Sequence, residues 1–122
     1  MMIKSYRELI VWQKADRLAF DIYQLSNNFP KKYLYDLTSQ LRRAALSVPT
    51  NLAEGCASPH SGELLQFINI SRRSLSETRY LIEFASKLNL ISPEKVKELD
   101  RLCADIGKML AALTRSIKKQ KE

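Results

Sequence analysis

Apolar residues recur every three or four positions, without a break, near the end of the chain. The series comprises Val96, Leu99, Cys103, Ile106, Leu110, Leu113 and Ile117. An α-helix turns once in about 3.6 residues, so this spacing places the whole series on one stripe of a helix. We predict that the stripe faces a helical core, and that Cys103, which lies within it, is a core residue.

Three further segments show the same periodicity. Their apolar or small positions are Val11, Ala15, Leu18, Ile22, Leu25 and Phe29, then Leu41, Ala45, Val48 and Leu52, then Leu64, Ile68, Ser71, Leu75, Thr78, Ile82 and Ala85. Pro30, the segment 55–59 and Ser92 with Pro93 separate the segments, because proline and glycine end helices and Ser-Pro begins them. We predict one domain over residues 1–122, with helices at about 7–28, 37–55, 61–88 and 93–119. Short connections make neighbours antiparallel, which gives an all-α fold, an antiparallel up-down-up-down four-helix bundle.

The composition argues against several classes of protein. No apolar run approaches about 18 residues, so we expect no membrane span. The first residues lack the apolar stretch of a secretory signal. The two cysteines, Cys56 and Cys103, lie far apart with no second ligand nearby, which favours free thiols in a reducing compartment. We therefore expect a cytoplasmic protein without a metal site.

Residues with catalytic chemistry are scarce. The single histidine, His60, lies in a turn next to Pro59, whereas a general base needs both a partner and a pocket. The sequence contains neither the Glu-x-x-His motif of di-iron bundles nor a glycine-rich phosphate loop. We predict no catalytic residue, no cofactor and no small-molecule substrate, and hence no enzymatic activity.

The chain is basic, with 20 Lys and Arg against 13 Asp and Glu and a net charge of +7. Five basic residues recur at steps of four and seven on the face of the last helix opposite its apolar stripe. We call this set the basic ridge: Lys97, Arg101, Lys108, Arg115 and Lys119. It is about 33 Å long at about 1.5 Å per residue, and it suits phosphate contacts. A solvated outer face would have the same pattern, and no aromatic residue lies on the ridge for bases to stack on.

Between residues 37 and 55, two further faces flank the apolar stripe. One is polar and comprises Gln40, Arg43, Ser47, Asn51 and Glu54; the other is apolar and comprises Leu46, Pro49 and Ala53. A helix of a four-helix bundle gains a second buried side only from another subunit or a ligand, so the apolar face predicts a homo-oligomer. The alternative is a locally satisfied surface with scattered apolar residues. We also predict that Arg43 and Glu54 act together, with Gln40 and Asn51 as hydrogen-bonding neighbours, because a partly buried charge persists only when it is paired.

Several stretches resemble one protein family. They are Leu9–Ala15 with Tyr23 and Phe29-Pro30, Leu37–Ala44, Ser47–Gly55 and Ser74–Glu77. These residues are similar to bacterial four-helix-bundle proteins, some of which are encoded in intervening sequences of large-subunit ribosomal RNA genes. The resemblance covers about residues 5–117, and it implies a bundle that assembles as a ring, with a pentamer preferred, and no assigned enzymatic activity. The chain also resembles accessory proteins of diversity-generating retroelements, which are basic pentameric bundles that bind a reverse transcriptase and nucleic acid.

Two functional hypotheses follow from these features. The first is a non-enzymatic, basic, oligomeric bundle that binds RNA or a ribonucleoprotein through phosphate contacts of the basic ridge. The second is a protein–protein scaffold or adaptor without a nucleic-acid role, whose charge serves solubility. Salt-dependent binding of RNA would distinguish them.

Overall fold

The computed structural model describes residue 3 and residues 5–121, with only the backbone of Lys121. The described part contains four α-helices and no β-strand: α1 Ile10–Ser26, α2 Ser39–Ala57, α3 Ser61–Lys87 and α4 Pro93–Lys121. Short helical turns precede α1 and α2, namely η1 (Tyr6–Glu8), η2 (Lys31–Tyr33) and η3 (Leu34–Thr38). Residues 1, 2, 4 and 122 of the predicted domain lie outside this description.

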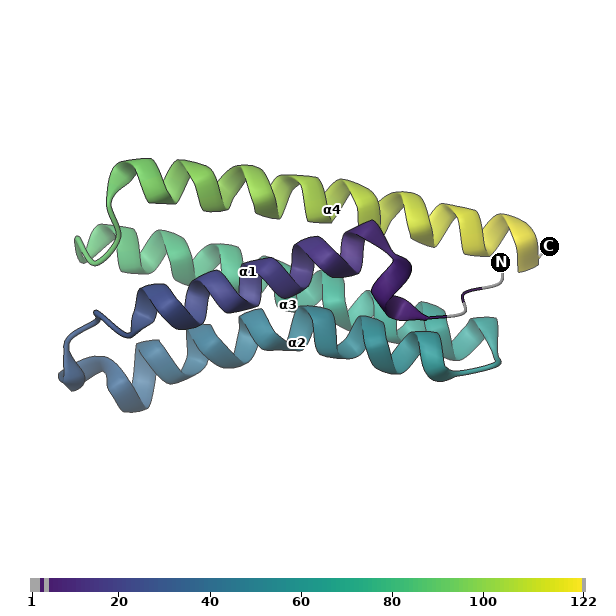
Figure 1. Ribbon diagram of the computed structural model, residues 1–122, viewed down its shortest axis with the longest axis horizontal. Coiled ribbons are helices and arrows are strands. Elements are labelled where there is room, and N and C mark those ends of the chain that lie inside the picture. Colours follow the sequence, from purple (N-terminus) through teal and green to yellow (C-terminus); the bar gives the residue numbers. More distant parts are fainter. Residues whose placement is uncertain (1–2, 4, 122) are drawn as a thin grey trace.

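Successive helices run in opposite directions, so that the start of α1 and the end of α4 point toward the same end of the bundle (Figure 1). Contacts join α1 to α2, α2 to α3, α3 to α4 and α4 back to α1. The helices therefore occupy the four corners of a bundle, in which α2 and α4 are diagonally opposite. This arrangement confirms the predicted fold class, an all-α four-helix bundle.

The helix ends differ from the predicted ones where local backbone conformation intervenes. Helix α1 begins three residues later than predicted, because Leu9 is extended (φ −75°, ψ 123°) and separates η1 from the helix. Helical structure before α2 begins earlier than predicted, because the π-helical turn η3 leads directly into α2. Helix α4 begins at Pro93 as expected, where the Ser92 hydroxyl accepts a hydrogen bond from the backbone N–H of Lys95 (3.2 Å).

The predicted apolar stripes form one core. The fully buried members with the largest side chains include Leu18, Ile22, Leu41, Leu52, Ile68, Leu99, Ile106 and Leu110. In α4, Cys103 and Ile117 are also buried, whereas Val96 and Leu113 are partly exposed and pack against the rim of the core. The sequence interpretation of Cys103 as a core residue is thus confirmed.

Helices α2 and α3 share the most extensive contact in the bundle. Small polar residues mediate it: the Ser71 hydroxyl donates to the Val48 carbonyl (2.9 Å), and the Ser47 and Ser74 hydroxyls lie 2.8 Å apart. Gly55 is buried so close to α3 that a Cβ atom there would lie 2.8 Å from Cβ of Phe67. Small side chains along these two helices therefore permit a close approach that larger ones would prevent.

Candidate nucleic-acid interface

The side chains of the basic ridge are all exposed along the outer surface of α4. They lie within about 40° of one another around the helix, at about 100° per residue. Helix α4 occupies one corner of the bundle and packs mainly against α3 and α1, so the five ridge side chains lie on its outward surface. The structure therefore places the five predicted residues together as one line of positive charge.

None of the ion pairs formed within the described residues involves the basic ridge. The pairs are Lys14–Asp105 (3.3 Å), Arg79–Asp100 (2.9 Å), Lys95–Asp21 (3.8 Å) and Lys95–Glu98 (3.3 Å). Three acidic residues border the ridge: Glu98 and Asp105 are each paired with a lysine outside it, whereas Glu94 is exposed and forms no ion pair within the described residues. The side chains of the basic ridge are exposed to solvent, whereas Glu98 and Asp105 form ion pairs with Lys95 and Lys14.

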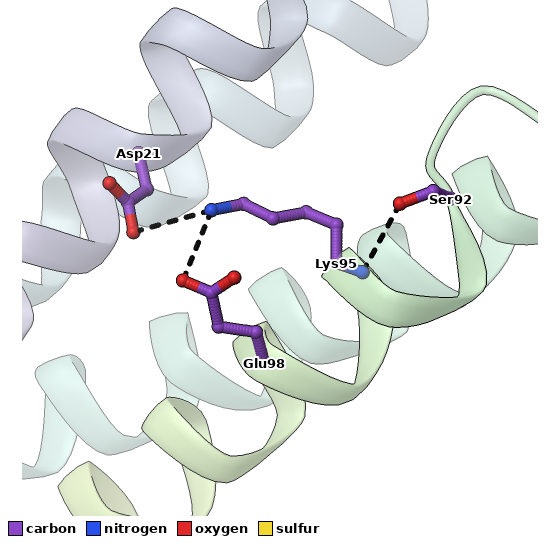
Figure 2. A network of polar contacts seen from close by, with 4 residues as sticks. All are labelled: Asp21, Ser92, Lys95 and Glu98. Atoms are coloured by element: carbon purple, nitrogen blue, oxygen red, sulfur yellow. Dashed lines mark hydrogen bonds and ion pairs between the residues drawn. The ribbon is translucent and has the colours of Figure 1, made fainter.

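Lys95 is a lysine of α4 with a different environment (Figure 2). Its Nζ lies between Asp21 of α1 and Glu98 of α4, and its backbone N–H donates to the hydroxyl of Ser92, which caps the helix. The Lys95 and Asp21 side chains are mostly buried, with 29% and 21% of their surface exposed. Lys95 joins α4 to α1 through an ion pair. Helix α4 therefore carries one cation that links two helices and a ridge of cations that form no ion pair within the described residues.

The polar face of α2 is turned toward α3 and forms bonds within the chain. The Gln40 amide donates to Glu77 (3.2 Å), and the Asn51 amide donates to both the carbonyl and the hydroxyl oxygen of Ser47 (2.8 Å each). Since Ser47 also contacts Ser74 of α3, this part of the face connects the two helices.

Arg43 and Glu54 do not form the predicted pair within one chain. Eleven residues separate them along α2, which is about 16 Å at about 1.5 Å per residue. Both side chains are exposed, and neither forms an ion pair within the described residues. The prediction assumed a partly buried charge, and exposure to water removes the need for a partner.

The apolar face of α2 requires a correction. Pro49 was expected to lie on a surface that only another subunit or a ligand could cover, but it is buried within the chain. Trp12 of α1 covers this region and donates its indole N–H to the Pro49 carbonyl (3.1 Å). Leu46 remains 46% exposed, and Ala53 is partly exposed. Only part of the face is therefore free for another molecule.

Arg42, which the sequence analysis placed in the stretch Leu37–Ala44 without a structural role, is the most connected residue at the start of α2. Its guanidinium donates to the Ser26 hydroxyl (2.7 Å), the Asn27 side-chain carbonyl (2.8 Å) and the Tyr23 carbonyl (3.2 Å), and it lies 4.9 Å from the centre of the Tyr23 ring. These bonds satisfy carbonyl and side-chain groups at the end of α1. Helical position alone distinguishes Arg42 from Arg43, because only the former points toward α1.

Exposed aromatic residues form a second group that the periodicity analysis missed. Tyr35 of η3 is 92% exposed, and Tyr80 and Phe84 of α3 are 58% and 42% exposed. Tyr80 and Phe84 are one turn apart, with ring centres separated by 6.4 Å. In the sequence, these aromatic residues lie outside the apolar stripes. An aromatic residue in such a position indicates apolar surface that the rest of the chain does not cover.

The groups with reactive chemistry stay apart. His60 is exposed at the N-terminal cap of α3, and no cluster of three or more metal-ligating side chains occurs in the described residues. Burial raises the pKa of the Cys103 thiol to about 11, and the pKa of the partly buried Cys56 thiol is also raised by burial. Both are free thiols. Among the described helices, none combines the length and the apolar character needed to cross a bilayer.

Comparisons with known proteins bear on the family. A family model described as 23S rRNA-intervening sequence protein matches residues 7–112, which is most of the chain. A crystal structure of a protein with unknown function from the S23 ribosomal protein family of Bacteroides thetaiotaomicron VPI-5482 is 20% identical to the chain. It superposes with a TM-score of 0.80 over 87% of this chain and 96% of that one. No curated protein matches the sequence. The similarity to accessory proteins of diversity-generating retroelements stays a prediction.

Proposed function

The chain belongs to the 23S rRNA-intervening sequence protein family, and from the surface it carries we propose that it is a non-enzymatic, oligomeric protein that binds RNA. The phosphate backbone is the feature recognised, and the basic ridge of α4 is the surface that recognises it. The observation that carries the proposal is the difference in pairing on α4. Its outward cations have no ion-pair partner among the described residues, while Glu98 and Asp105 beside them do.

Phosphate binding by such a ridge depends on counterion release. Each phosphate neutralised on a single strand contributes about −0.7 to the slope of log affinity against log salt concentration. Five contacts from one subunit give a slope of about −3.5, which corresponds to about a 100-fold loss of affinity between 50 and 200 mM salt. Without an aromatic residue on the ridge, discrimination between base sequences should be small.

Self-association belongs to the same proposal. A homo-oligomer, with a pentamer preferred from the family resemblance, would repeat the ridge on every copy and create a large basic surface. We place this activity in the cytoplasm, where the free thiols Cys56 and Cys103 would stay reduced. No cofactor and no small-molecule substrate is required.

The second candidate is a protein scaffold or adaptor that does not bind nucleic acid. The exposed aromatic residues Tyr35, Tyr80 and Phe84 favour it, because apolar surface of this kind commonly binds another protein. The two candidates differ in whether the basic ridge or the aromatic surface carries the biological role.

Fluorescence anisotropy with a labelled single-stranded RNA, between 50 and 200 mM salt, tests the first candidate. Changing Lys97, Arg101, Lys108 and Arg115 to Gln should reduce the magnitude of the salt slope by about 2.8, because four contacts are lost. A control variant removes the same charge from exposed residues elsewhere, by changing Arg17, Lys31, Lys32 and Arg72 to Gln, and should keep most of the slope.

Three results would contradict the proposal or redirect it. Absence of binding by the unmodified protein at low salt would leave the ridge as a solvated face and favour the scaffold. An unchanged slope in the ridge variant would place the phosphate contacts elsewhere on the protein. Equal losses in the ridge and control variants would mean that net charge acts, rather than the line of charge on α4.

A further inference from the structure

We infer that a hollow between α3 and α4 binds one base of the RNA strand whose phosphates the basic ridge holds, with guanine preferred. In this arrangement the ring of Tyr80 stacks on the base, and the carboxylate of Glu83 accepts hydrogen bonds from its edge. The inference rests on the proposed function and deepens it, because it adds recognition of one base to the recognition of phosphate.

The hollow has the construction of a site for a flat, largely apolar group. Its volume is about 480 Å³, and Ile82, Val96 and Cys103 supply apolar lining. Ile82 and Cys103 also belong to the core of the bundle, so packing holds this part of the wall in place. Tyr80 lines the same hollow and is 58% exposed. A base would bury its faces against these side chains and keep its polar edge near the charged ones.

The ring of Tyr80 is available for stacking. The ring of Phe84 lies 6.4 Å away and is tilted by 50°, so the two rings do not stack face to face. A base stacked on one aromatic side chain typically gains about 5- to 150-fold in affinity. Because every base has a flat face, stacking alone tolerates all four bases, and a preference has to come from the polar groups of the hollow.

Those polar groups favour the edge of a base over a phosphate. Arg79 and Asp100, which both line the hollow, form an ion pair with each other (2.9 Å). Glu83 is exposed and forms no ion pair within the described residues. An unpaired carboxylate repels phosphate but accepts hydrogen bonds from N–H groups. Guanine offers two adjacent N–H donors on its pairing edge, which match the two carboxylate oxygens, whereas uracil offers one N–H between two carbonyl groups.

The basic ridge has different neighbours on its two sides. At about 100° per residue, its border toward α1 carries three carboxylates, namely Glu94, Glu98 and Asp105. Its border toward α3 carries the small residues Ala104 and Ala111. The carboxylate that lies on this side, Asp100, is paired with Arg79 of α3. Phosphates held by the ridge are therefore drawn away from α1 and toward α3, where the hollow lies.

The register of α3 and α4 brings the hollow beside two cations of the ridge. The ion pair between Arg79 and Asp100 sets the last third of α3 beside the first third of α4. Lys97 lies three residues before Asp100 and Arg101 follows it directly, so both are within about one helical turn of the hollow. A nucleotide carries its base and its phosphate on either side of one sugar. One strand can therefore place phosphates against Lys97 and Arg101 and a base against Tyr80.

The salt dependence of binding separates stacking from phosphate contacts. Tyr80→Ala should weaken the binding of a labelled single-stranded RNA that contains guanosine by about 5- to 150-fold, because a stacked base is lost. The slope of log affinity against log salt concentration should stay the same, because no phosphate contact is removed. Tyr80→Phe keeps the ring and should bind like the unmodified protein. Fluorescence anisotropy over a range of salt concentrations measures both quantities.

Base preference tests the role of Glu83. The unmodified protein should bind oligouridine with interspersed guanosines at least about 5-fold more tightly than plain oligouridine. Glu83→Ala should abolish this preference, although the loss of a negative charge raises the affinity for both strands. Glu94→Ala is the matched control, since it removes an exposed, unpaired carboxylate on the other side of the ridge. It should raise both affinities and keep the preference.

Further controls separate this inference from loss of folding and from the proposed function. Phe20→Ala changes an aromatic residue of α1 that is 63% exposed and should leave the affinity unchanged. Circular dichroism should show the same helix content in all variants.

Four results would overturn the inference. A Tyr80→Ala variant that binds as tightly as the unmodified protein would leave the aromatic residues of α3 as a surface for another protein. A smaller salt slope in that variant would mean that Tyr80 acts through phosphate contacts. Equal binding of the two strands, or a preference that survives Glu83→Ala, would remove the recognition of guanine. If the ridge variant loses its slope while Tyr80→Ala changes nothing, the proposed function stands and this inference alone fails, whereas absence of RNA binding at low salt contradicts both.

Discussion

Helices α2 and α4 lie at opposite corners of the bundle and use their polar residues in different ways. The polar residues of α2 mostly bind within the chain: Arg42 holds α1, Ser47 contacts α3, and Gln40 binds Glu77. On α4, the outward cations of the basic ridge have no ion-pair partner among the described residues. Polar residues of α2 therefore help determine how the helices pack, while the basic ridge of α4 is free to contact another molecule.

Pro49 lies where α2 accepts hydrogen bonds from both of its neighbours. Proline lacks the N–H that would bond to the carbonyl four residues earlier, and it disturbs the regular ladder of a helix. Around it, carbonyls of α2 accept bonds from both neighbours, since Val48 accepts from Ser71 and Pro49 accepts from Trp12. Helix α4 has no proline after its first residue, and the five side chains of its basic ridge are exposed.

The inner and outer faces of α4 should differ most in their effect on stability. Leu110 is fully buried, so Leu110→Ala should lower the free energy of unfolding by about 2–5 kcal/mol through lost transfer and a residual cavity. Lys108→Ala, two residues away on the exposed face, should change it by less than about 0.5 kcal/mol. Urea denaturation at one fixed protein concentration measures both. Equal effects would mean that the ridge takes part in packing after all.

Arg42 of α2 and Arg72 of α3 offer a smaller contrast, between a cation that is bonded within the chain and one that is exposed. Arg42→Ala should lower the free energy of unfolding by about 1–3 kcal/mol, because it leaves acceptors at the end of α1 without their charged donor. The control is Arg72→Ala on the exposed face of α3, where a change below about 0.5 kcal/mol is expected. Thermal and urea unfolding of both variants, monitored by circular dichroism, provide the measurement. A stability change for Arg42→Ala no larger than that of the control would show that its contacts contribute nothing net.

The fold was predictable because periodicity is a local property. Each apolar stripe, from Val11 to Ile117, specifies a helix and its inward face without knowledge of the neighbours, and the four stripes close into one core. The line of charge on α4 followed from the same periodicity. What could not be predicted depends on which helix lies opposite which residue: the cover that Trp12 places on Pro49, the role of Arg42, and the exposure that leaves Arg43 and Glu54 unpaired. Spacing along a helix places residues on a face but does not identify what that face meets.

Gly55 of α2 and Gly107 of α4 both lie within helices, so alanine substitutions at these positions compare how closely the two helices pack against their neighbours. A Cβ atom at Gly55 would lie 2.8 Å from Cβ of Phe67 and 3.1 Å from Cδ1 of Leu64, whereas at Gly107 its nearest neighbour would be Cδ2 of Leu75 at 3.6 Å. Alanine is favoured over glycine in a helix by about 1 kcal/mol. Gly107→Ala should therefore raise the free energy of unfolding by about 0.5–1 kcal/mol. At Gly55 the forced shift of α3 costs more than this gain, so Gly55→Ala should lower it by about 1 kcal/mol.

Opposite signs for the two substitutions, measured by urea denaturation at matched protein concentration, would mean that α2 and α3 are packed to their limit while α4 is not. Two stabilising results would mean that α3 can move away from α2 at little cost. In that case the Ser47–Ser74 and Ser71–Val48 bonds, which depend on the same close approach, should be dispensable as well. Ser71→Ala distinguishes the two situations. It should destabilise by about 0.5–1.5 kcal/mol, the usual net contribution of one hydrogen bond, only if the close contact is maintained.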